Sequence, residues 1–340
     1  MGGSLIPVDR PTGPASVYLS MMRYVFPLAA LVFSVLPLAA EVTYTLTPDF
    51  ITPPPGRETL GDSHGEIRVD KAGRIYVSVQ GQAEGGIQVY SPEGKYLHHL
   101  AGTPGSLHGF VIHQEEAGEF IYAAVLGESR VLKLTLEGKV VLEIPKASFP
   151  AEQAAAGLKL TSCDVAPNGD IYVVDGYGKD WIFVFDKAGT YKTVFGGQGE
   201  PLKLKNTHKI FVDPRFTPAR ILACDRGNNR ILHLDLDGKL IGVVADQDLR
   251  RPSSASFHGD LMCVAEIAGS ISVFNKEGKL IASLGANETA GETNTPKVPP
   301  AQWRTGTVTS PHGITFDNAG NILETEWNNF GRILRWTVAK

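Results

Sequence analysis

The 340-residue chain has no basic arm and no stripe of lysine and arginine, and it contains only 3 cysteines. Its 32 basic and 36 acidic residues give a formal net charge of −4. Proteins that bind nucleic acid need a basic face for phosphate contacts, so we expect no nucleic-acid partner. Cys163, Cys224 and Cys263 are odd in number and far apart, which excludes a disulfide framework. We expect buried free thiols, with a single disulfide as the alternative.

Charged residues are also missing from residues 24–40, the run YVFPLAALVFSVLPLAA, which follows Arg23. A positive start, an apolar middle and a small-residue end are typical of a signal peptide. We therefore predict a signal peptide over residues 1–40, cleaved after Ala40, and a secreted or periplasmic protein. The alternative is a membrane anchor, but the run is short and no basic cluster follows it.

Residues 1–20 do not resemble a targeting segment. We expect Met21 or Met22 to be the true start of the protein. The predicted cleavage site carries no cysteine, so a lipid anchor is not expected there. After cleavage we expect no membrane span.

What the sequence does contain is a repeat. One unit of strand-like runs and glycine-containing turns recurs six times, and each copy holds four short apolar runs. Short strands separated by turn residues predict an all-β protein. A four-stranded unit buries both faces when its copies pack around an axis, so we predict a six-bladed β-propeller over residues 41–340. The copies contain IRVDKAGRIYV, FVIHQEEAGEFIYAAV, CDVAPNGDIYVVD, IFVDPRFTPARILACD, SASFHGDLMCVAE and ITFDNAGNILETE.

Three segments depart from the repeat. The last copy lacks a fourth strand, and residues 41–48, EVTYTLTP, are strand-like. We predict that they form the outer strand of blade six and close the ring, which removes a free edge. Alanine-rich residues 147–160 predict a short helix between blades two and three. Residues 286–310 form a polar insertion of a length typical of functional or disordered loops, and Asn287 begins a glycosylation triplet.

Three histidines occupy the same position in alternate copies of the repeat: His108, His208 and His312 begin the first strand of blades two, four and six. First strands line the channel of a propeller, and alternate blades face one another across it. We therefore predict that the three imidazoles converge and bind a metal ion, with water in an open position as in catalytic zinc sites. The alternative is that each histidine only bonds backbone groups near the channel mouth.

The remaining first strands have no histidine at this position. The equivalent residues in blades one, three and five are close to Gly65, Thr161 and Ser253. His64 is one residue out of register, so it is not included in the predicted site. The cysteines do not share the register either and are not proposed as ligands.

The turns after the second strands should reach the same mouth. They place Tyr177 in DGYGKD, Arg226 in DRGNNR and Trp327 in EWNN. A phenol beside a metal can act as base or acid, and an arginine can hold a carboxylate through two parallel hydrogen bonds. The alternative is turn chemistry alone, with Arg226 paired to Asp225.

The segments LHGFVIHQEEAGEFIYAAV, DVAPNGDIYVVDGYGKDWIFVFD, THKIFVDP, ILACDRGNNRILHL and PHGITFDNAG resemble NHL-repeat propellers. More closely, they resemble the peptidyl-α-hydroxyglycine α-amidating lyase domain. The resemblance implies a six-bladed propeller that releases glyoxylate from a hydroxyglycine end. It also implies zinc ligands at His108, His208 and His312, a catalytic tyrosine at Tyr177 and a substrate-side arginine at Arg226.

The sequence departs from this family in three ways. The turn SVQGQAEGG of blade one has Gln80 and Gln82 where the family has a catalytic arginine. Gly313 stands where the family has an acidic calcium ligand, so calcium is not expected. The chain has no copper monooxygenase half to make the hydroxylated substrate, which a partner protein could supply.

From these observations we expect a zinc-dependent, lyase-like enzyme that acts on a small carboxylate-bearing substrate or a peptide end. The alternative is a non-catalytic propeller that binds a protein or a ligand, because the fold alone does not determine chemistry. A lactonase-like calcium centre fits poorly, since it needs carboxylates where this chain has histidine or small residues.

Overall fold

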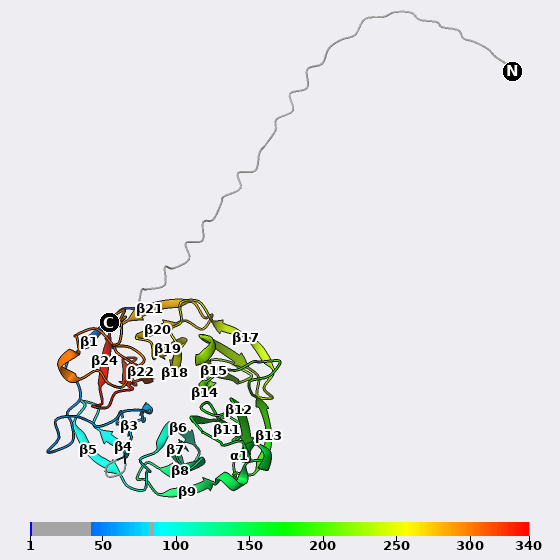
Figure 1. The fold of residues 1–340 in the computed structure, drawn as a ribbon, viewed down its shortest axis with the longest axis horizontal. Coiled ribbons are helices and arrows are strands. Elements are labelled where there is room, and N and C mark those ends of the chain that lie inside the picture. The colour runs from blue at the N-terminus through cyan, green and yellow to red at the C-terminus, as the bar shows by residue number, and fades with distance from the viewer. Residues whose placement is uncertain (2–41, 82–84, 340) are drawn as a thin grey trace, which may run out of the picture. The chain divides into compact units, whose positions relative to one another are not determined.

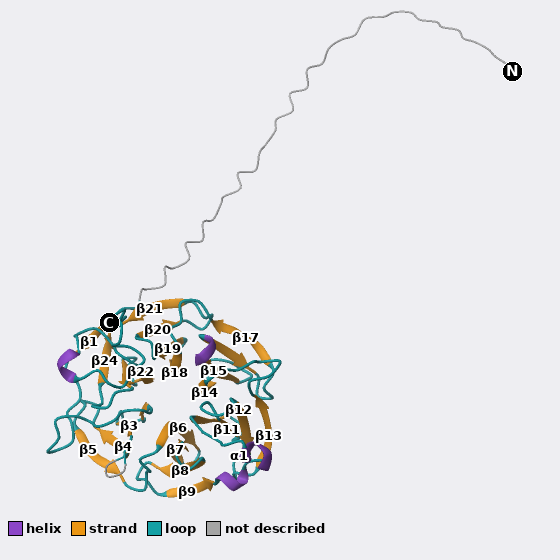
Figure 2. Ribbon diagram, in the orientation of Figure 1, coloured by secondary structure: helices purple, strands orange, loops and turns teal. Residues whose placement is uncertain are grey.

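The computed structural model describes residues 1, 42–81 and 85–339 and shows a six-bladed β-propeller (Figure 1). Six four-stranded antiparallel sheets surround a central axis, and helices are few (Figure 2). The predicted all-β propeller is confirmed. The predicted signal peptide and its cleavage site lie outside the described residues, apart from Met1. In the part of the chain that is described, no helix is long and apolar enough to cross a membrane.

In blades one to five the strands follow the chain from the axis to the rim, and in blade six the N-terminal strand takes the outer place. Blade one contains β2 (Ile67–Val69), β3 (Ile75–Val79), β4 (Gly86–Tyr90) and β5 (Tyr96–Leu100); blade two contains β6 (Leu107–Glu115), β7 (Gly118–Val125), β8 (Arg130–Thr135) and β9 (Val140–Ile144); blade three contains β10 (Ser162–Val165), β11 (Ile171–Val174), β12 (Trp181–Phe185) and β13 (Tyr191–Gly196). Blade four contains β14 (Thr207–Asp213), β15 (Arg220–Asp225), β16 (Arg230–Leu234) and β17 (Leu240–Ala245); blade five contains β18 (Pro252–His258), β19 (Leu261–Glu266), β20 (Ser270–Phe274) and β21 (Leu280–Leu284); blade six contains β22 (Pro311–Phe316), β23 (Ile322–Glu326), β24 (Ile333–Val338) and β1 (Tyr44–Thr47).

The turn between the third and fourth strands of a blade is held by a side-chain oxygen that accepts backbone hydrogen bonds. In blade three, Asp186 Oδ1 accepts hydrogen bonds from the amides of Ala188 and Thr190, both at 2.9 Å. Gly189 completes this turn with φ 82°, in the left-handed region that favours glycine. The aspartate and glycine of the repeat are therefore turn residues that reverse the chain between strands.

The hydrophobic core lies between neighbouring blades. Between blades three and four it includes Val174, Ile182, Leu204, Ile210 and Leu232, all buried. A fully buried aliphatic side chain stabilises the fold by about 1.5–3 kcal/mol. Packing blade on blade is thus the main force that holds the channel-lining strands in place.

The ring closes as predicted. β1 pairs antiparallel with β24, with Tyr44 opposite Val338 and Leu46 opposite Trp336. Figure 1 shows β1, at the blue end of the described chain, beside the red β24. The N-terminal strand therefore covers the outer edge of blade six.

The two insertions are ordered. The predicted short helix is present as α1 (Ala151–Ala155), preceded by the 3-10 turn η1 (Lys146–Ser148). The 286–310 insertion contains the turn η3 (Pro300–Gln302) and is fixed by Asn287, which is 2% exposed. The Asn287 amide donates to the Val308 carbonyl at 2.9 Å. This buried amide is therefore a structural tie, not an accessible glycosylation site.

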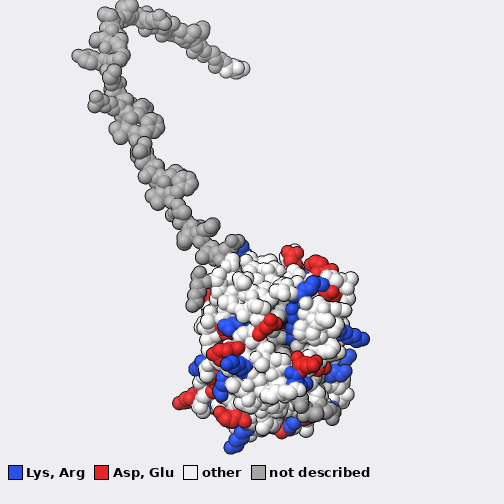
Figure 3. All heavy atoms as spheres, turned by 90° about the vertical axis from the view of Figure 1, so that its left-hand side faces the viewer, with Lys and Arg blue, Asp and Glu red and all other residues white. Residues whose placement is uncertain are grey.

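The three cysteines are free and buried, as expected. Acidic and basic side chains are interspersed on the side of the ring seen in Figure 3.

Candidate metal centre

A local irregularity in the strands directs each predicted histidine to the axis. The pairing of β6 with β7 skips His108, since Leu107 pairs with Val125 and Gly109 with Ala124. The pairing register also shifts where His208 and His312 stand in β14 and β22. Such a bulge re-aims a side chain, so each histidine leaves its ladder and points into the channel.

A backbone carbonyl of the next blade fixes each ring. Nδ1 of His108 donates to the Thr161 carbonyl, Nδ1 of His208 to that of Ser253 and Nδ1 of His312 to that of Gly65, each at 2.7 Å. These acceptors occupy the position equivalent to the histidines in blades three, five and one. A carbonyl can only accept, so Nδ1 carries the proton and Nε2 keeps a free lone pair. Metal-binding histidines are held in the same way.

The three rings lie against one another. Their centroids are 5.0 Å apart for His108 and His208, 4.5 Å for His208 and His312, and 5.1 Å for His108 and His312. Nε2 of His108 and of His312 is buried without a hydrogen-bond partner among the described residues. A buried acceptor without a partner is costly, which indicates a site that takes a ligand.

The electrostatics favour neutral imidazoles. All three rings are fully buried, and burial lowers their pKa values well below the ordinary value. The neutral form is the one that binds a metal. The site is therefore ready to bind a cation without first losing protons.

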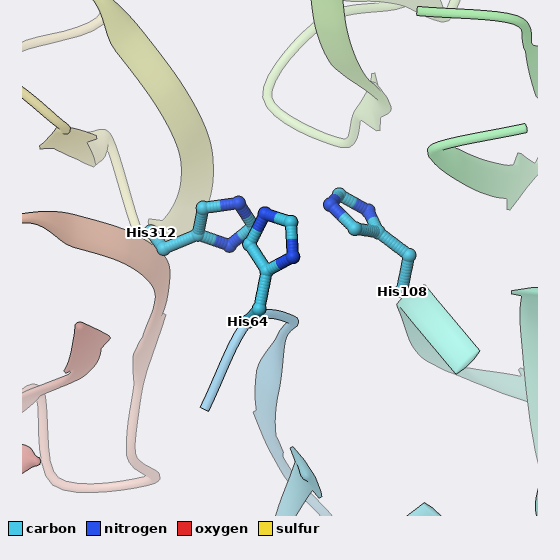
Figure 4. Close-up of side chains that lie close together, drawn as sticks. All are labelled: His64, His108 and His312. Carbon is cyan, nitrogen blue, oxygen red and sulfur yellow. The ribbon is translucent and has the colours of Figure 1, made fainter. Parts of the chain in front are cut away.

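The sequence reasoning missed His64, which the structure places in the same cluster. One ligand nitrogen each of His64, His108 and His312 lie within 4.8 Å of one another (Figure 4), and His208 is not part of this group. His64 precedes β2 and lies outside the strands, so strand register does not decide where it points. Its position directly before Gly65, the blade-one equivalent, was the available signal. Burial, reinforced by Arg226 and Lys209, lowers the pKa of His64 to about 3.

The predicted tyrosine and tryptophan lie over the histidines. The Tyr177 hydroxyl is 3.0 Å from Nε2 of His208 and 3.2 Å from Nε2 of His64. The Trp327 ring centroid is 5.4 Å from that of His64. Both residues follow the second strand of their blade, as expected. Tyr177, Trp327 and His64 are partly exposed, so they separate the buried rings from solvent.

Arg226 is buried beside Tyr177, and its guanidinium lies 5.4 Å from the Tyr177 ring centroid. Its Nε donates to Asn206 Oδ1 at 2.8 Å, while Nη1 has no hydrogen-bond partner among the described residues. The alternative pairing with Asp225 is not seen, because Asp225 bonds Arg230 at 2.6 Å. Arg226 thus offers a free donor at the site.

A buried ion pair lies next to the histidines. Lys209 Nζ lies 2.9 Å from Glu66 Oε2 and also donates to the carbonyls of Gly65 and His312. Arg68 approaches the same carboxylate at 3.2 Å. Burial lowers the pKa of Lys209 to about 8, although Glu66 opposes this shift. The ion pair therefore borders the histidine cluster through the backbone of Gly65 and His312.

The residues that depart from the amidating-lyase pattern have structural roles here. The Gln80 amide donates to the carbonyls of His64 and Leu107 at 2.9 and 3.2 Å. Gln82 lies outside the described residues. A Cβ at Gly313 would lie 2.7 Å from Glu66 Oε1 and 2.8 Å from the Glu66 backbone, so this position has no room for a side chain.

No protein-family model and no curated protein matches the chain. Solved structures do match it. A streptogramin B lyase is 16% identical with a TM-score of 0.57, and the match covers 87% of this chain and 98% of that one. Virginiamycin B lyase from Staphylococcus aureus is 16% identical with a TM-score of 0.54, covering 83% and 97%. A Bacteroides thetaiotaomicron protein of unknown function is 11% identical with a TM-score of 0.59, covering 82% and 70%. At these identities the likeness shows a shared propeller fold.

Proposed function

We propose that the chain is a metal-dependent lyase that holds a zinc-type ion with His108, His208 and His312. Its substrate is a small molecule or peptide end that carries a carboxylate. The observation that carries the proposal is the set of three buried imidazoles whose ring centroids lie 4.5–5.1 Å apart, each donating its Nδ1 hydrogen to a backbone carbonyl. Neutral imidazole nitrogens with such carbonyl partners fit zinc. When bound, the ion would polarise a substrate oxygen.

Tyr177 is positioned to move the proton. Its hydroxyl lies within hydrogen-bond distance of both His208 and His64, so it reaches the space in which a substrate hydroxyl would lie. In the reaction implied by the amidating-lyase resemblance, the substrate hydroxyl would give its proton to the Tyr177 oxygen as its C–O bond becomes C=O and the carbon–nitrogen bond breaks. The hydrogen that Tyr177 carried would pass to the leaving amide nitrogen, so that Tyr177 ends neutral and glyoxylate is released.

Arg226 is positioned to anchor the carboxylate. Its free Nη1 donor lies on the Tyr177 side of the cluster. A guanidinium binds a carboxylate with fixed geometry, which would hold the reacting carbon beside Tyr177.

Propellers of this fold support lyase chemistry. Among the similar structures is a virginiamycin B lyase with quinupristin, solved as a catalytically inactive histidine-to-alanine variant, which is 15% identical with a TM-score of 0.51. This supports a role for histidine in a lyase of this shape, and it does not indicate the substrate of this chain.

Metal analysis of the purified protein tests the proposal. We expect one zinc ion per chain, lost when His108, His208 and His312 are changed to alanine. The matched control changes three exposed histidines, His98, His99 and His258, to alanine and should keep the ion. Equal zinc in all three proteins would refute the site.

Turnover tests the chemistry separately. Tyr177→Phe should keep the metal and lower turnover of an α-hydroxyglycine peptide by about 10²–10⁴-fold, the usual contribution of a general acid or base. A variant that loses both metal and turnover would place Tyr177 in metal binding instead.

The second candidate is a binding module. It is favoured by Gln80, whose amide bonds two backbone carbonyls in the turn where the family has a catalytic arginine. If metal-loaded protein turns over no α-hydroxyglycine peptide, binding becomes the better account.

We also propose that the protein is exported to a secreted or periplasmic location. N-terminal sequencing of the mature protein should then give Glu41 as its first residue. A mature protein that retains residues before Glu41 would contradict the predicted cleavage.

A further inference from the structure

His64 is held differently from the other histidines of the cluster. His108, His208 and His312 stand inside strands, and each has its Nδ1 bonded to a carbonyl. His64 lies before β2, after the isolated bridge between Ser63 and Asn328. The hydrogen bond of its ring is to a side chain, the Tyr177 hydroxyl. Its ring is therefore the one that can turn at the smallest cost.

His64 also stands between the buried rings and solvent. Its ring centroid lies 5.0 Å from that of His108 and 4.7 Å from that of His312. His64 is partly exposed, whereas His108 and His312 are fully buried. Figure 4 shows the three rings turned toward a common space, with His64 arriving from its own segment. A ligand that reaches the buried rings from this side would therefore pass His64 together with Tyr177 and Trp327.

The distances suit coordination. Zinc binds imidazole nitrogens at about 2.0–2.1 Å, so nitrogens on one tetrahedral ion are about 3.4 Å apart. The ligand nitrogens of His64, His108 and His312 already lie within 4.8 Å of one another. A small turn of the His64 ring brings it onto an ion held by the buried histidines.

We propose that His64 is a fourth, exchangeable ligand of the metal ion. It closes the coordination sphere when no substrate is present and leaves when a substrate oxygen takes its place. Four nitrogen ligands make a closed sphere, whereas catalysis needs an open position. His64 is the least anchored ligand, so its departure from the ion would create this open position. This inference rests on the proposed metal site and adds the residue that controls access to it.

X-ray absorption at the zinc edge counts the imidazole ligands directly. We expect four in the zinc-loaded wild type and three after saturation with glycolate, a small α-hydroxy carboxylate. His64→Ala should show three with or without glycolate, and its zinc affinity should fall by at least about tenfold, a loss that outer partners alone can cause. The control, His113→Ala, changes a histidine on the same strand as His108 and should keep four.

The outcomes separate the two proposals. Zinc bound by three imidazoles in the wild type, or by four in His64→Ala, overturns the role of His64 and leaves the metal site intact. A count of four that persists in the glycolate complex overturns the exchange. Absence of zinc from the wild type overturns the metal site and this inference with it. His64→Gln, which keeps side-chain bulk at the mouth, replaces the alanine variant if that protein does not fold.

Discussion

At the level of single residues, the ion pair of Glu66 and Lys209 holds the chain around the candidate metal centre. Lys209 Nζ, at 2.9 Å from Glu66 Oε2, also donates to the carbonyl of Gly65, which in turn accepts the Nδ1 proton of His312. The orientation of one ring thus depends on a charge pair buried beside it. Buried pairs of this kind fix geometry more than they add stability.

Removal of one partner should be costly. Glu66→Gln leaves Lys209 and Arg68 buried without their carboxylate, and we expect a loss of about 3–5 kcal/mol in the free energy of unfolding. The control is Glu200→Gln, whose pair with Lys203 is exposed and should contribute less than about 1 kcal/mol. Denaturant unfolding of the metal-free proteins measures both. If both variants lose a similarly small free energy of unfolding, the buried pair does not stabilise the structure around the histidines.

A second buried carboxylate predicts a pH dependence. Burial raises the pKa of Asp213, but hydrogen bonds from Arg215 and His233 outweigh it and lower this pKa from 3.8 to about 2. The folded-state pKa lies below the unfolded value, so the stabilisation is complete above about pH 4 and is lost as the pH falls through about 2. The stability difference between wild type and Asp213→Asn should therefore narrow between pH 5 and pH 2. A difference that stays constant over this range would contradict the assignment.

The sequence predicted the three inward histidines because they share one position in a repeat. His64 was missed because it stands outside the first strand of its blade, although its position directly before Gly65 was a signal. The sequence could not predict the carbonyl partners at Nδ1, which come from neighbouring blades and are backbone groups that any residue carries.

At the level of elements, the repeat pattern predicted the closing strand, because the last repeat has only three strand-like runs. Blade six lacks a fourth strand of its own, and β1 supplies it. By contrast, the order of the 286–310 insertion depends on the buried Asn287 and on Arg304, which bonds Asn287 Oδ1 at 3.0 Å. Such a tie between particular side chains leaves no periodic signal in the sequence.

Truncation tests the closing strand. A chain that starts at residue 51 loses β1, which uncovers the edge of β24 and the packing of Tyr44 and Leu46 on the core. We expect a loss of about 1.5–3 kcal/mol in unfolding free energy, because Tyr44 and Leu46 are only partly buried and each contributes less than a fully buried side chain. A chain that starts at residue 42 is the control and should match the full-length protein. Thermal unfolding and hydrogen exchange of the β24 amides measure the effect, and equal melting temperatures for both truncations would refute it.

At the level of the whole molecule, one ion would join blades two, four and six across the axis. A ligand that binds the folded state alone stabilises it by about 2.7 kcal/mol at a concentration 100 times its dissociation constant. Excess zinc should therefore raise the melting temperature of the wild type. In the triple variant of His108, His208 and His312 the melting temperature should not change. An equal rise in both proteins would place the ion elsewhere.

Anomalous diffraction at the zinc edge from crystals of the zinc-loaded protein tests the central claim most directly. The account predicts one peak on the channel axis, about 2.0–2.1 Å from Nε2 of His108, His208 and His312. A zinc peak away from the axis, or an axis without a peak in crystals that contain zinc, would contradict it.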